Sequence, residues 1–127
     1  MADNLQVELV SADRVVWSGE ATMVTARTTD GEIGVLRNHA PVLSVLLPSA
    51  VKIDSGDERV FAVIDGGFIS VANNRVSVLA EHAQLSREVN LDEARRELEE
   101  ARANAESPQD PALMLAEARV SVGEKAR

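Results

Sequence analysis

The chain has no cysteine, few aromatic residues and no long apolar run. The absence of cysteine excludes disulfides, thiolate chemistry and cysteine-ligated zinc. The two histidines, His39 and His82, are far apart in the sequence, which argues against a histidine-rich metal site. Aromatic residues make up only 2% of the chain, so its hydrophobic core must be built from valine, leucine, isoleucine and alanine.

No apolar segment approaches the roughly 20 residues that span a bilayer. The N-terminal sequence MADNLQVELV has no basic region followed by an apolar stretch, so it does not resemble a secretory signal. We therefore expect a cytosolic protein, or one attached to a membrane only through other proteins. The net charge of −8 and the lack of a Lys/Arg cluster argue against nucleic acid and anionic lipid as partners. Basic or neutral proteins are favoured instead.

Residues 1–88 have the pattern of short strands. Leu5, Val7 and Leu9 alternate with polar residues, which is the period of a half-buried strand. Further short apolar segments follow, and residues that favour tight turns separate them. The predicted turns are Asp30-Gly31, Ser55-Gly56-Asp57, Asp65-Gly66-Gly67 and Asn73-Asn74. Many short strands without intervening helices predict an antiparallel β-sandwich of about ten strands.

Residues 89–127 change to a helical pattern. Asn90 is a typical N-cap, and Glu93 follows it three residues later. A break at residues 107–111 precedes a second helix, which Asp110 can cap with Pro111 at its first position. The first helix has an apolar seam formed by Leu91, Ala94, Leu98, Ala101 and Ala105, and the second by Leu113, Ala116 and Val120. The sequence predicts an αα-hairpin that ends near Gly123.

The predicted hairpin has few large apolar side chains with which to anchor itself. Its first seam contains three alanines and two leucines. Because ordering a residue costs about 1–2 kcal/mol, two short alanine-rich helices need a surface on which to pack. The sandwich or a partner protein could supply that surface. Where the two surfaces differ by about a few kcal/mol, a ligand or a neighbouring subunit can switch the hairpin between them.

Four local motifs, in order, resemble the epsilon subunit of F-type ATP synthases, called delta in mitochondria. They are Gly31-Glu32-Ile33-Gly34-Val35-Leu36, His39-Ala40-Pro41-Val42-Leu43, Gly66-Gly67-Phe68-Ile69-Ser70-Val71, and Val78-Leu79-Ala80-Glu81 with the tail opening Leu91-Asp92-Glu93-Ala94-Arg95. Each motif alone is weak, whereas their order, their spacing and the sandwich-then-hairpin layout are specific. The family usually has glycine where Asn38 stands, and asparagine also tolerates left-handed geometry.

The resemblance implies a non-catalytic subunit of the central stalk, on the cytoplasmic side of the cell membrane and without direct membrane insertion. It implies a sandwich that docks on the gamma subunit and the c-ring, and so helps to couple proton-driven rotation to ATP synthesis. It further implies a hairpin that regulates ATP hydrolysis by extending along gamma and transiently contacting the alpha and beta subunits. In isolation the chain is expected to be a monomer without a cofactor, other than a regulatory ATP.

The resemblance also assigns contact residues to two loops of the sandwich. Glu32, His39 and Pro41 match the family's loops that face the c-ring and gamma. Short exposed loops at one end of a sandwich are natural contact points. The structural alternative is that residues 31–34 only form a hairpin turn and that His39 caps a loop.

Four residues of the tail match positions associated with ATP in some bacterial members of the family. They are Asp92, Arg95, Arg102 and Arg119. Guanidinium groups on a folded hairpin could hold a triphosphate through bidentate bonds. Alternatively, Asp92–Arg95, Arg95–Glu99 and Glu99–Arg102 are ordinary ion pairs along one helix. The chain has no glycine-rich phosphate loop, and Ser86 stands near the place of an acidic residue of the ATP-binding members.

Two other function classes compete with a rotor subunit. The first is a free-standing β-sandwich binding module whose helical tail pairs between chains through the seam of the first helix. The second is a small hydrolase that uses His82 with a nearby carboxylate, although no nucleophile has a recognisable setting. We predict that His82 is structural and that Trp17 packs at the core or its rim.

Overall fold

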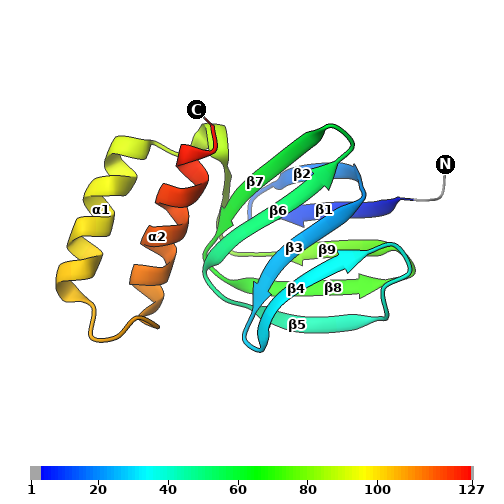
Figure 1. Ribbon diagram of the computed structural model, residues 1–127, viewed down its shortest axis with the longest axis horizontal. Helices are drawn as coiled ribbons and strands as arrows, with labels where there is room; N and C mark the ends of the chain where they lie inside the picture. Colours follow the sequence, from blue (N-terminus) through cyan, green and yellow to red (C-terminus); the bar gives the residue numbers. More distant parts are fainter. Residues whose placement is uncertain (1–3, 127) are drawn as a thin grey trace.

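Ten strands and two helices make up residues 4–126, the part of the chain that this computed structural model describes (Figure 1). The strands are β1 (Leu5–Val10), β2 (Val15–Ala21), β3 (Met23–Thr28), β4 (Gly31–Leu36), β5 (Val42–Leu46), β6 (Ser49–Ser55), β7 (Glu58–Ile64), β8 (Gly67–Ala72), β9 (Arg75–Leu79) and β10 (Ala83–Leu85). A short 3-10 turn, η1 (Ser86–Glu88), leads to α1 (Leu91–Asn104) and α2 (Pro111–Glu124). The predicted β-sandwich followed by a helical hairpin is confirmed.

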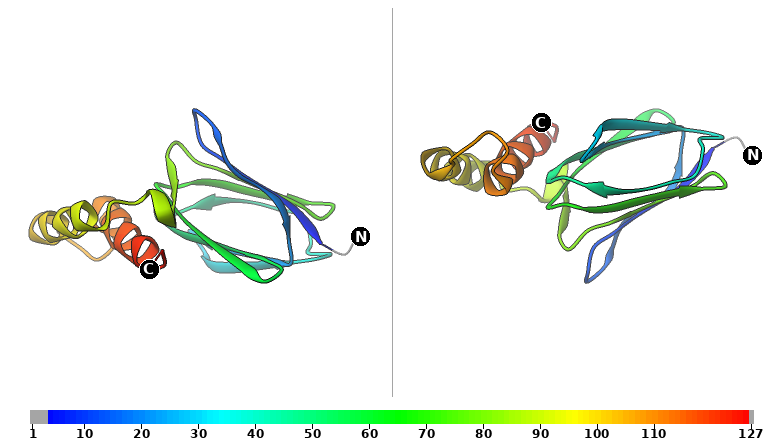
Figure 2. Two further views of the ribbon diagram at one scale, coloured as in Figure 1. Left: turned by 90° about the horizontal axis from the view of Figure 1, so that it is seen from above. Right: turned by 90° about the horizontal axis from the view of Figure 1, so that it is seen from below.

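The strands fold into two layers that enclose the core (Figure 2). One layer has the order β4-β3-β6-β7-β10, and the other has the order β5-β8-β9-β1-β2. A single residue pair, Thr28 with Leu46, joins the layers between β3 and β5. The pairs are antiparallel except for β1 and β9, which run parallel. The predicted antiparallel sheet needs this correction, because a strand pair that is distant in sequence leaves no local signal.

The core between the layers consists almost entirely of aliphatic side chains. The alternation of β1 places Leu5 and Leu9 completely inside, at 0% exposure. Valines, isoleucines, leucines and alanines of the other strands fill the rest of the space, as the low aromatic content predicts. Trp17 is partly buried and packs against this core, which confirms its predicted place at the rim.

Tight turns form where asparagine and glycine predicted them. Asn38, Asn73 and Asn74 all have positive φ angles, of 68°, 52° and 62°. Gly56 joins β6 to β7 with a φ of 64°. Asparagine adopts this left-handed region at a smaller penalty than other residues with a Cβ, so Asn38 replaces the family's glycine without altering the backbone geometry that the turn needs.

Both helices begin at their predicted caps. The side chain of Asn90 accepts a hydrogen bond from the backbone N–H of Glu93 at 3.1 Å. Asp110 caps α2 by accepting from the backbone N–H of Ala112 at 2.9 Å. α2 ends at Glu124, one residue beyond the predicted stop at Gly123. Gly123 is buried inside the last turn, where the lack of a side chain allows close packing.

The hairpin lies beside the sandwich and touches it mainly through α2 (Figures 1 and 2). Ala118 and Val122 of α2 pack against Val63 of β7, with Phe61 and Leu115 around them. The seam of α1 turns toward α2, and its Leu91, Ala94 and Leu98 are buried. Among residues 4–126, no helix is long and apolar enough to cross a bilayer. The hairpin is thus held by a second, much smaller apolar cluster than the core of the sandwich.

Candidate functional site

An exposed row of apolar side chains crosses the outer face of the layer β5-β8-β9-β1-β2. Val45 pairs with Phe68, and Phe68 pairs with Leu79 on the next strand. Leu79 in turn pairs with Val10, and Val10 pairs with Val15. Directly paired residues of neighbouring strands point to the same face, so these five side chains form one continuous row.

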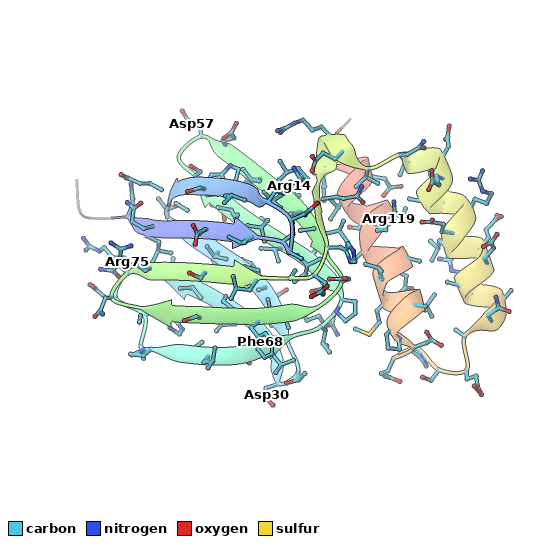
Figure 3. All side chains as sticks on the ribbon, turned by 180° about the vertical axis from the view of Figure 1, so that it is seen from behind. Arg14, Asp30, Asp57, Phe68, Arg75 and Arg119 are labelled. Atoms are coloured by element: carbon cyan, nitrogen blue, oxygen red, sulfur yellow. The ribbon has the colours of Figure 1, made fainter. Side chains whose placement is uncertain are left out.

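Leu43 extends this row along β5, and we call the six residues the apolar stripe: Val10, Val15, Leu43, Val45, Phe68 and Leu79. Leu43 is 76% exposed and Phe68 is 51% exposed. The row that Leu43 begins is otherwise polar, because Leu43 pairs with Ser70 and Ser70 pairs with Ser77. A contiguous apolar surface with a polar border is typical of a protein–protein contact. The face can be seen in Figure 3, where Phe68 is labelled.

The stripe was not among the predicted sites, although the sequence carries a signal for it. Leu43 and Val45 alternate with Val42 and Leu46, so that β5 is apolar on both of its faces. A strand with one solvated face should alternate instead. An apolar run in an antiparallel strand therefore indicates a second buried face, and in this protein that face is uncovered.

The loop between β4 and β5 lies at the end of the sandwich that is distant from the helices (Figure 1). The backbone N–H of Asn38 donates to Oδ1 of Asn74 at 2.6 Å, which fixes the loop on the β8–β9 turn. Nδ1 of His39 forms a hydrogen bond of 2.7 Å with the carbonyl of the adjacent Ala40. Pro41 is exposed. His39 therefore supports the loop locally, while Pro41 is available at its surface.

Glu32 does not share this end of the molecule with His39 and Pro41. It lies near the β3–β4 turn, where it lines a groove together with residues of the α1–α2 loop such as Pro108 and Gln109. The strand β4 separates the two positions, and a strand advances about 3.3 Å per residue. The expectation that these contact residues gather at one end of the sandwich is therefore wrong, because β4 carries the chain from one end to the other.

The tail residues matched to ATP contacts are spread over both helices. The guanidinium of Arg95 lies 3.6 Å from the carboxylate of Glu124, which joins the start of α1 to the end of α2. Arg119 forms an ion pair with Glu97 across the hairpin, and its side chain is only 19% exposed. Asp92 and Arg102 are exposed on α1.

The alternative ion pairs along α1, Asp92–Arg95, Arg95–Glu99 and Glu99–Arg102, do not form among the described residues. Among the described residues, Arg95 reaches Glu124 rather than Asp92 or Glu99. The sequence could not show this preference, because the partner belongs to a different helix. Arg95 and Arg119 therefore connect the two helices of the hairpin, in addition to the apolar seam.

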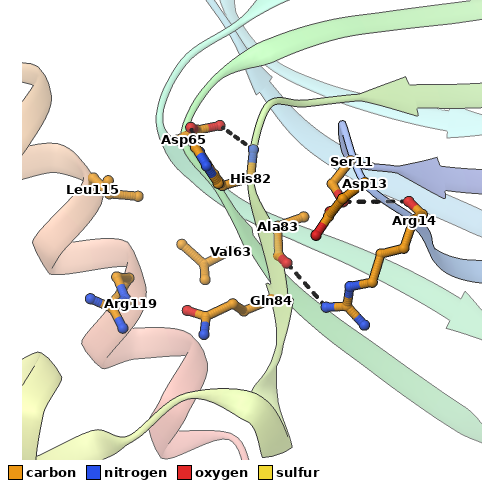
Figure 4. A pocket seen from close by; sticks show the side chains of 10 residues that line it. All are labelled: Ser11, Asp13, Arg14, Val63, Asp65, His82, Ala83, Gln84, Leu115 and Arg119. Atoms are coloured by element: carbon orange, nitrogen blue, oxygen red, sulfur yellow. Dashed lines mark hydrogen bonds and ion pairs between the residues drawn. The ribbon is translucent and has the colours of Figure 1, made fainter.

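A cavity of about 400 Å³ opens where the β1–β2 turn, β10 and α2 meet (Figure 4). In it, Nδ1 of His82 lies 2.9 Å from Oδ2 of Asp65, and Oδ1 of Asp65 accepts from the backbone N–H of His82. The hydrogen bond with Asp65 raises the pKa of His82 above its ordinary value. The hydroxyl of Ser11, also in this cavity, donates to Asp13 rather than to His82.

Arg14 lines this cavity on the side of η1, the segment that leads into α1. Its guanidinium lies 2.8 Å from Oε1 of Glu88 and 3.3 Å from the carbonyl of Ala83. The hydrogen bond between the pair raises the pKa of Arg14 and lowers the pKa of Glu88. This pair could not be predicted from local patterns, because its members are 74 residues apart in the sequence.

Comparison with known proteins places the chain among subunits of ATP synthases. Residues 4–86 match the family "ATP synthase, Delta/Epsilon chain, beta-sandwich domain". An ATP synthase epsilon chain from Streptomyces avermitilis is 54% identical over 108 residues, which cover 84% of this chain and 87% of the relative. Its counterpart from Streptomyces coelicolor is 50% identical over 124 residues, which cover 94% of this chain and 100% of the relative.

The fold also matches single chains within solved structures of ATP synthases. A chain in the mitochondrial ATP synthase of Euglena gracilis, described as OSCP/F1/c-ring in rotational state 1, superposes with a TM-score of 0.73 and 26% identity. The match covers 98% of this chain and 79% of that one. A chain of the central stalk and c-ring of the Tetrahymena thermophila enzyme gives a TM-score of 0.59 at 16% identity, which is a likeness of fold alone.

Proposed function

Because the chain belongs to the ATP synthase delta/epsilon family, we propose that it is the non-catalytic epsilon subunit of a central stalk, where it helps to couple proton-driven rotation to ATP synthesis. It lies at the cytoplasmic side of the cell membrane, peripherally, through contacts with other subunits. The sandwich of residues 1–88 serves as the docking domain, and residues 89–127 serve as the regulatory domain. The apolar stripe is the observation that carries this proposal.

The apolar stripe is the proposed docking surface for the gamma subunit. A stable interface buries about 800 Å² on each partner and has an apolar centre with a polar rim. The stripe supplies such a centre, and the polar row that includes Ser70 and Ser77 borders it. The net charge of −8 makes a neutral or basic surface the better electrostatic match on the partner.

The loop that carries His39 and Pro41 is proposed to face the c-ring. It lies at the end of the sandwich opposite the helices, and its bond to Asn74 holds it in one shape. A rigid, exposed loop can form a contact without a large ordering penalty. Glu32, at the other end of β4, then contacts a different part of the stalk from His39.

The helical hairpin is proposed to regulate ATP hydrolysis by leaving the sandwich and transiently reaching the alpha and beta subunits. Burying Val122 and Ala118 against the body contributes about 2–4 kcal/mol. Such a small anchor allows an open state to be populated measurably. Amide exchange should therefore be much faster in residues 90–122 than in the strands, and equal protection of the two parts would contradict the proposal.

Regulatory ATP binding at Asp92, Arg95, Arg102 and Arg119 stays a prediction. In the closed hairpin, Arg95 and Arg119 already bind the carboxylates of Glu124 and Glu97. A triphosphate must displace these carboxylates before it can form bidentate bonds. Titration of the isolated protein with millimolar ATP tests the site, and unchanged chemical shifts at Arg95 and Arg102 would end the idea.

The experiment for the docking surface compares two leucines on opposite faces. Leu43→Asp places a charge in the apolar stripe, whereas Leu36→Asp places it on the outer face of the other layer, where Leu36 is 55% exposed. We expect Leu43→Asp to weaken binding to purified gamma at least tenfold, because a carboxylate at an apolar interface is left unpaired. Leu36→Asp should bind within about twofold of the native chain. Equal binding by all three proteins would refute this surface.

The competing binding module predicts a dimer through the seam of α1. In this structure Leu91, Ala94 and Leu98 of that seam are buried within the same chain. The proposed rotor subunit should therefore have the mass of a monomer in light scattering. A dimer that Leu98→Glu dissociates would favour the binding module instead.

A further inference from the structure

Arg14 belongs to the turn that connects two members of the apolar stripe. Val10 ends β1 and Val15 begins β2, so only residues 11–14 lie between them. The backbone N–H of Ser11 donates to the carbonyl of Arg14 at 2.9 Å, which closes the base of this turn. Any partner that covers the stripe therefore contacts both ends of the turn that carries Arg14.

From this turn, the side chain of Arg14 reaches η1, the segment that leads into the helical hairpin. Its guanidinium donates to Oε1 of Glu88, which is the last residue of η1. The same carboxylate oxygen accepts from the backbone N–H of Leu85 at 2.8 Å, so it also closes the η1 turn. Arg14 thus connects the layer with the stripe to the segment from which both helices extend.

The connection continues from Glu88 into α2. Val89 follows Glu88 directly and packs in the apolar cluster that holds α2 on the sandwich. Gly123 of α2 lies close to Val89 and to Leu91. A continuous set of contacts therefore runs from the stripe through Arg14 and Glu88 to the anchor of the hairpin.

We propose that the Arg14–Glu88 pair is a positioning contact that couples docking at the apolar stripe to closure of the helical hairpin. This inference rests on the proposed function of the stripe. Docking restricts the β1–β2 turn, so that less conformational entropy is left to lose when Arg14 binds Glu88. The sign of the coupling follows: a docked subunit holds its hairpin closed more firmly than a free one. By linkage, a closed hairpin also favours docking.

The effect should be modest, because both partners are partly exposed and an ion pair of this kind is weak. We expect docking to increase the protection of α1 amides about two- to fivefold. A change of this size shifts the equilibrium between the closed and the open hairpin, because the apolar cluster that holds the hairpin on the sandwich is small.

The experiment measures amide exchange of residues 91–104 in the full chain, free and bound to purified gamma. The test variants are Arg14→Gln and Glu88→Gln, and glutamine at position 88 keeps an acceptor for the N–H of Leu85. Arg14→Lys retains the charge as a conservative variant. Arg75→Gln is the matched control, because Arg75 is an exposed arginine at the end of the sandwich that is distant from the helices (Figure 3).

In the free chain, Arg14→Gln and Glu88→Gln should speed exchange in α1 about two- to fivefold, while Arg75→Gln should not. On binding gamma, the native chain and Arg14→Lys should gain protection, and both glutamine variants should not. Combining the two glutamine substitutions should add nothing to either one.

The outcomes separate this inference from the proposed function. If gamma binds and all variants gain the same protection, the coupling is refuted while docking stands. If gamma binds none of the proteins, the docking function fails. In that case, if amide exchange in α1 is the same in the free Arg14→Gln variant as in the free native chain, the proposed role of the Arg14–Glu88 pair in closing the hairpin is refuted as well.

Discussion

Gly123, in the last turn of α2, lies directly against Val89 in the segment that leads into α1. A Cβ on Gly123 would be 3.0 Å from Cγ1 of Val89 and 3.1 Å from Cδ1 of Leu91. Both distances are shorter than ordinary van der Waals contact. The closed hairpin therefore depends on the absence of a side chain at this position, although glycine is unfavourable inside a helix.

Gly123→Leu should open the hairpin while leaving the sandwich folded. The larger side chain has no space beside Val89, and overpacking of this kind costs about 1–3 kcal/mol. We expect faster amide exchange throughout α2 and unchanged exchange in β8. Ser121→Leu, on the exposed side of the same turn, is the control and should leave exchange in α2 unchanged.

Two glycines of the sandwich should respond very differently to alanine. Gly31 and Gly67 both have positive φ angles, of 124° and 144°. A Cβ on Gly31 would meet nothing within 4 Å, so Gly31→Ala should cost only backbone strain of about 1–2 kcal/mol. A Cβ on Gly67 would lie 1.9 Å from the carbonyl oxygen of Leu79. Gly67→Ala should lower the free energy of unfolding, measured with urea, clearly more than Gly31→Ala does. Equal losses in the two variants would contradict this account.

Substitutions of Leu9 and Leu43 should affect different properties, the first the stability of the fold and the second the binding of gamma. Leu9 is completely buried in the core, so Leu9→Ala should lower the free energy of unfolding by about 2–5 kcal/mol. Leu43 lies in the apolar stripe, and Leu43→Ala should change that free energy by less than about 0.5 kcal/mol. The same Leu43→Ala variant should bind gamma more weakly than the native chain. A large loss of stability in Leu43→Ala would show that the stripe serves the fold instead.

The pair of His82 and Asp65 should make stability depend on pH. Asp65 raises the pKa of His82 from its ordinary value of about 6.5. A raised pKa means that the folded state binds the proton more tightly, so this contribution is complete below pH 6.5 and is lost as pH rises through the folded pKa. The Tm difference between the native chain and Asp65→Asn should therefore shrink as pH increases. NMR titration of the His82 ring should show a lower pKa in the variant, and identical titration curves would refute the pairing.

Local signals in the sequence sufficed for the strands, the turns and the helix caps. The alternation of Leu5, Val7 and Leu9 predicts an inward face that the structure confirms. Asn90 and Asp110 predict the helix starts because a cap bonds to N–H groups only two or three residues away. These features depend on near neighbours in the chain, so they can be recognised without a tertiary structure.

Contacts between segments that are distant in the sequence could not be predicted from local patterns. Glu32 and His39 looked like neighbours in sequence, but β4 places them at opposite ends of the sandwich. Arg95 has suitable carboxylates on its own helix, yet it pairs with Glu124 of the other helix. In each case, the partner was chosen by how two elements pack, which the spacing of residues along one element does not specify.

Local patterns in the chain were sufficient for the two kinds of structure, their order and the resemblance to ATP synthase epsilon subunits, because periodicity, caps and turn residues act over a few positions. The folded structure was needed to show which exposed apolar residues form one surface, namely Val10, Val15, Leu43, Val45, Phe68 and Leu79, and to show that Arg14 contacts Glu88. Strand register and helix docking bring together residues that are distant in the chain, and the free energy of those contacts exists only after the elements have packed.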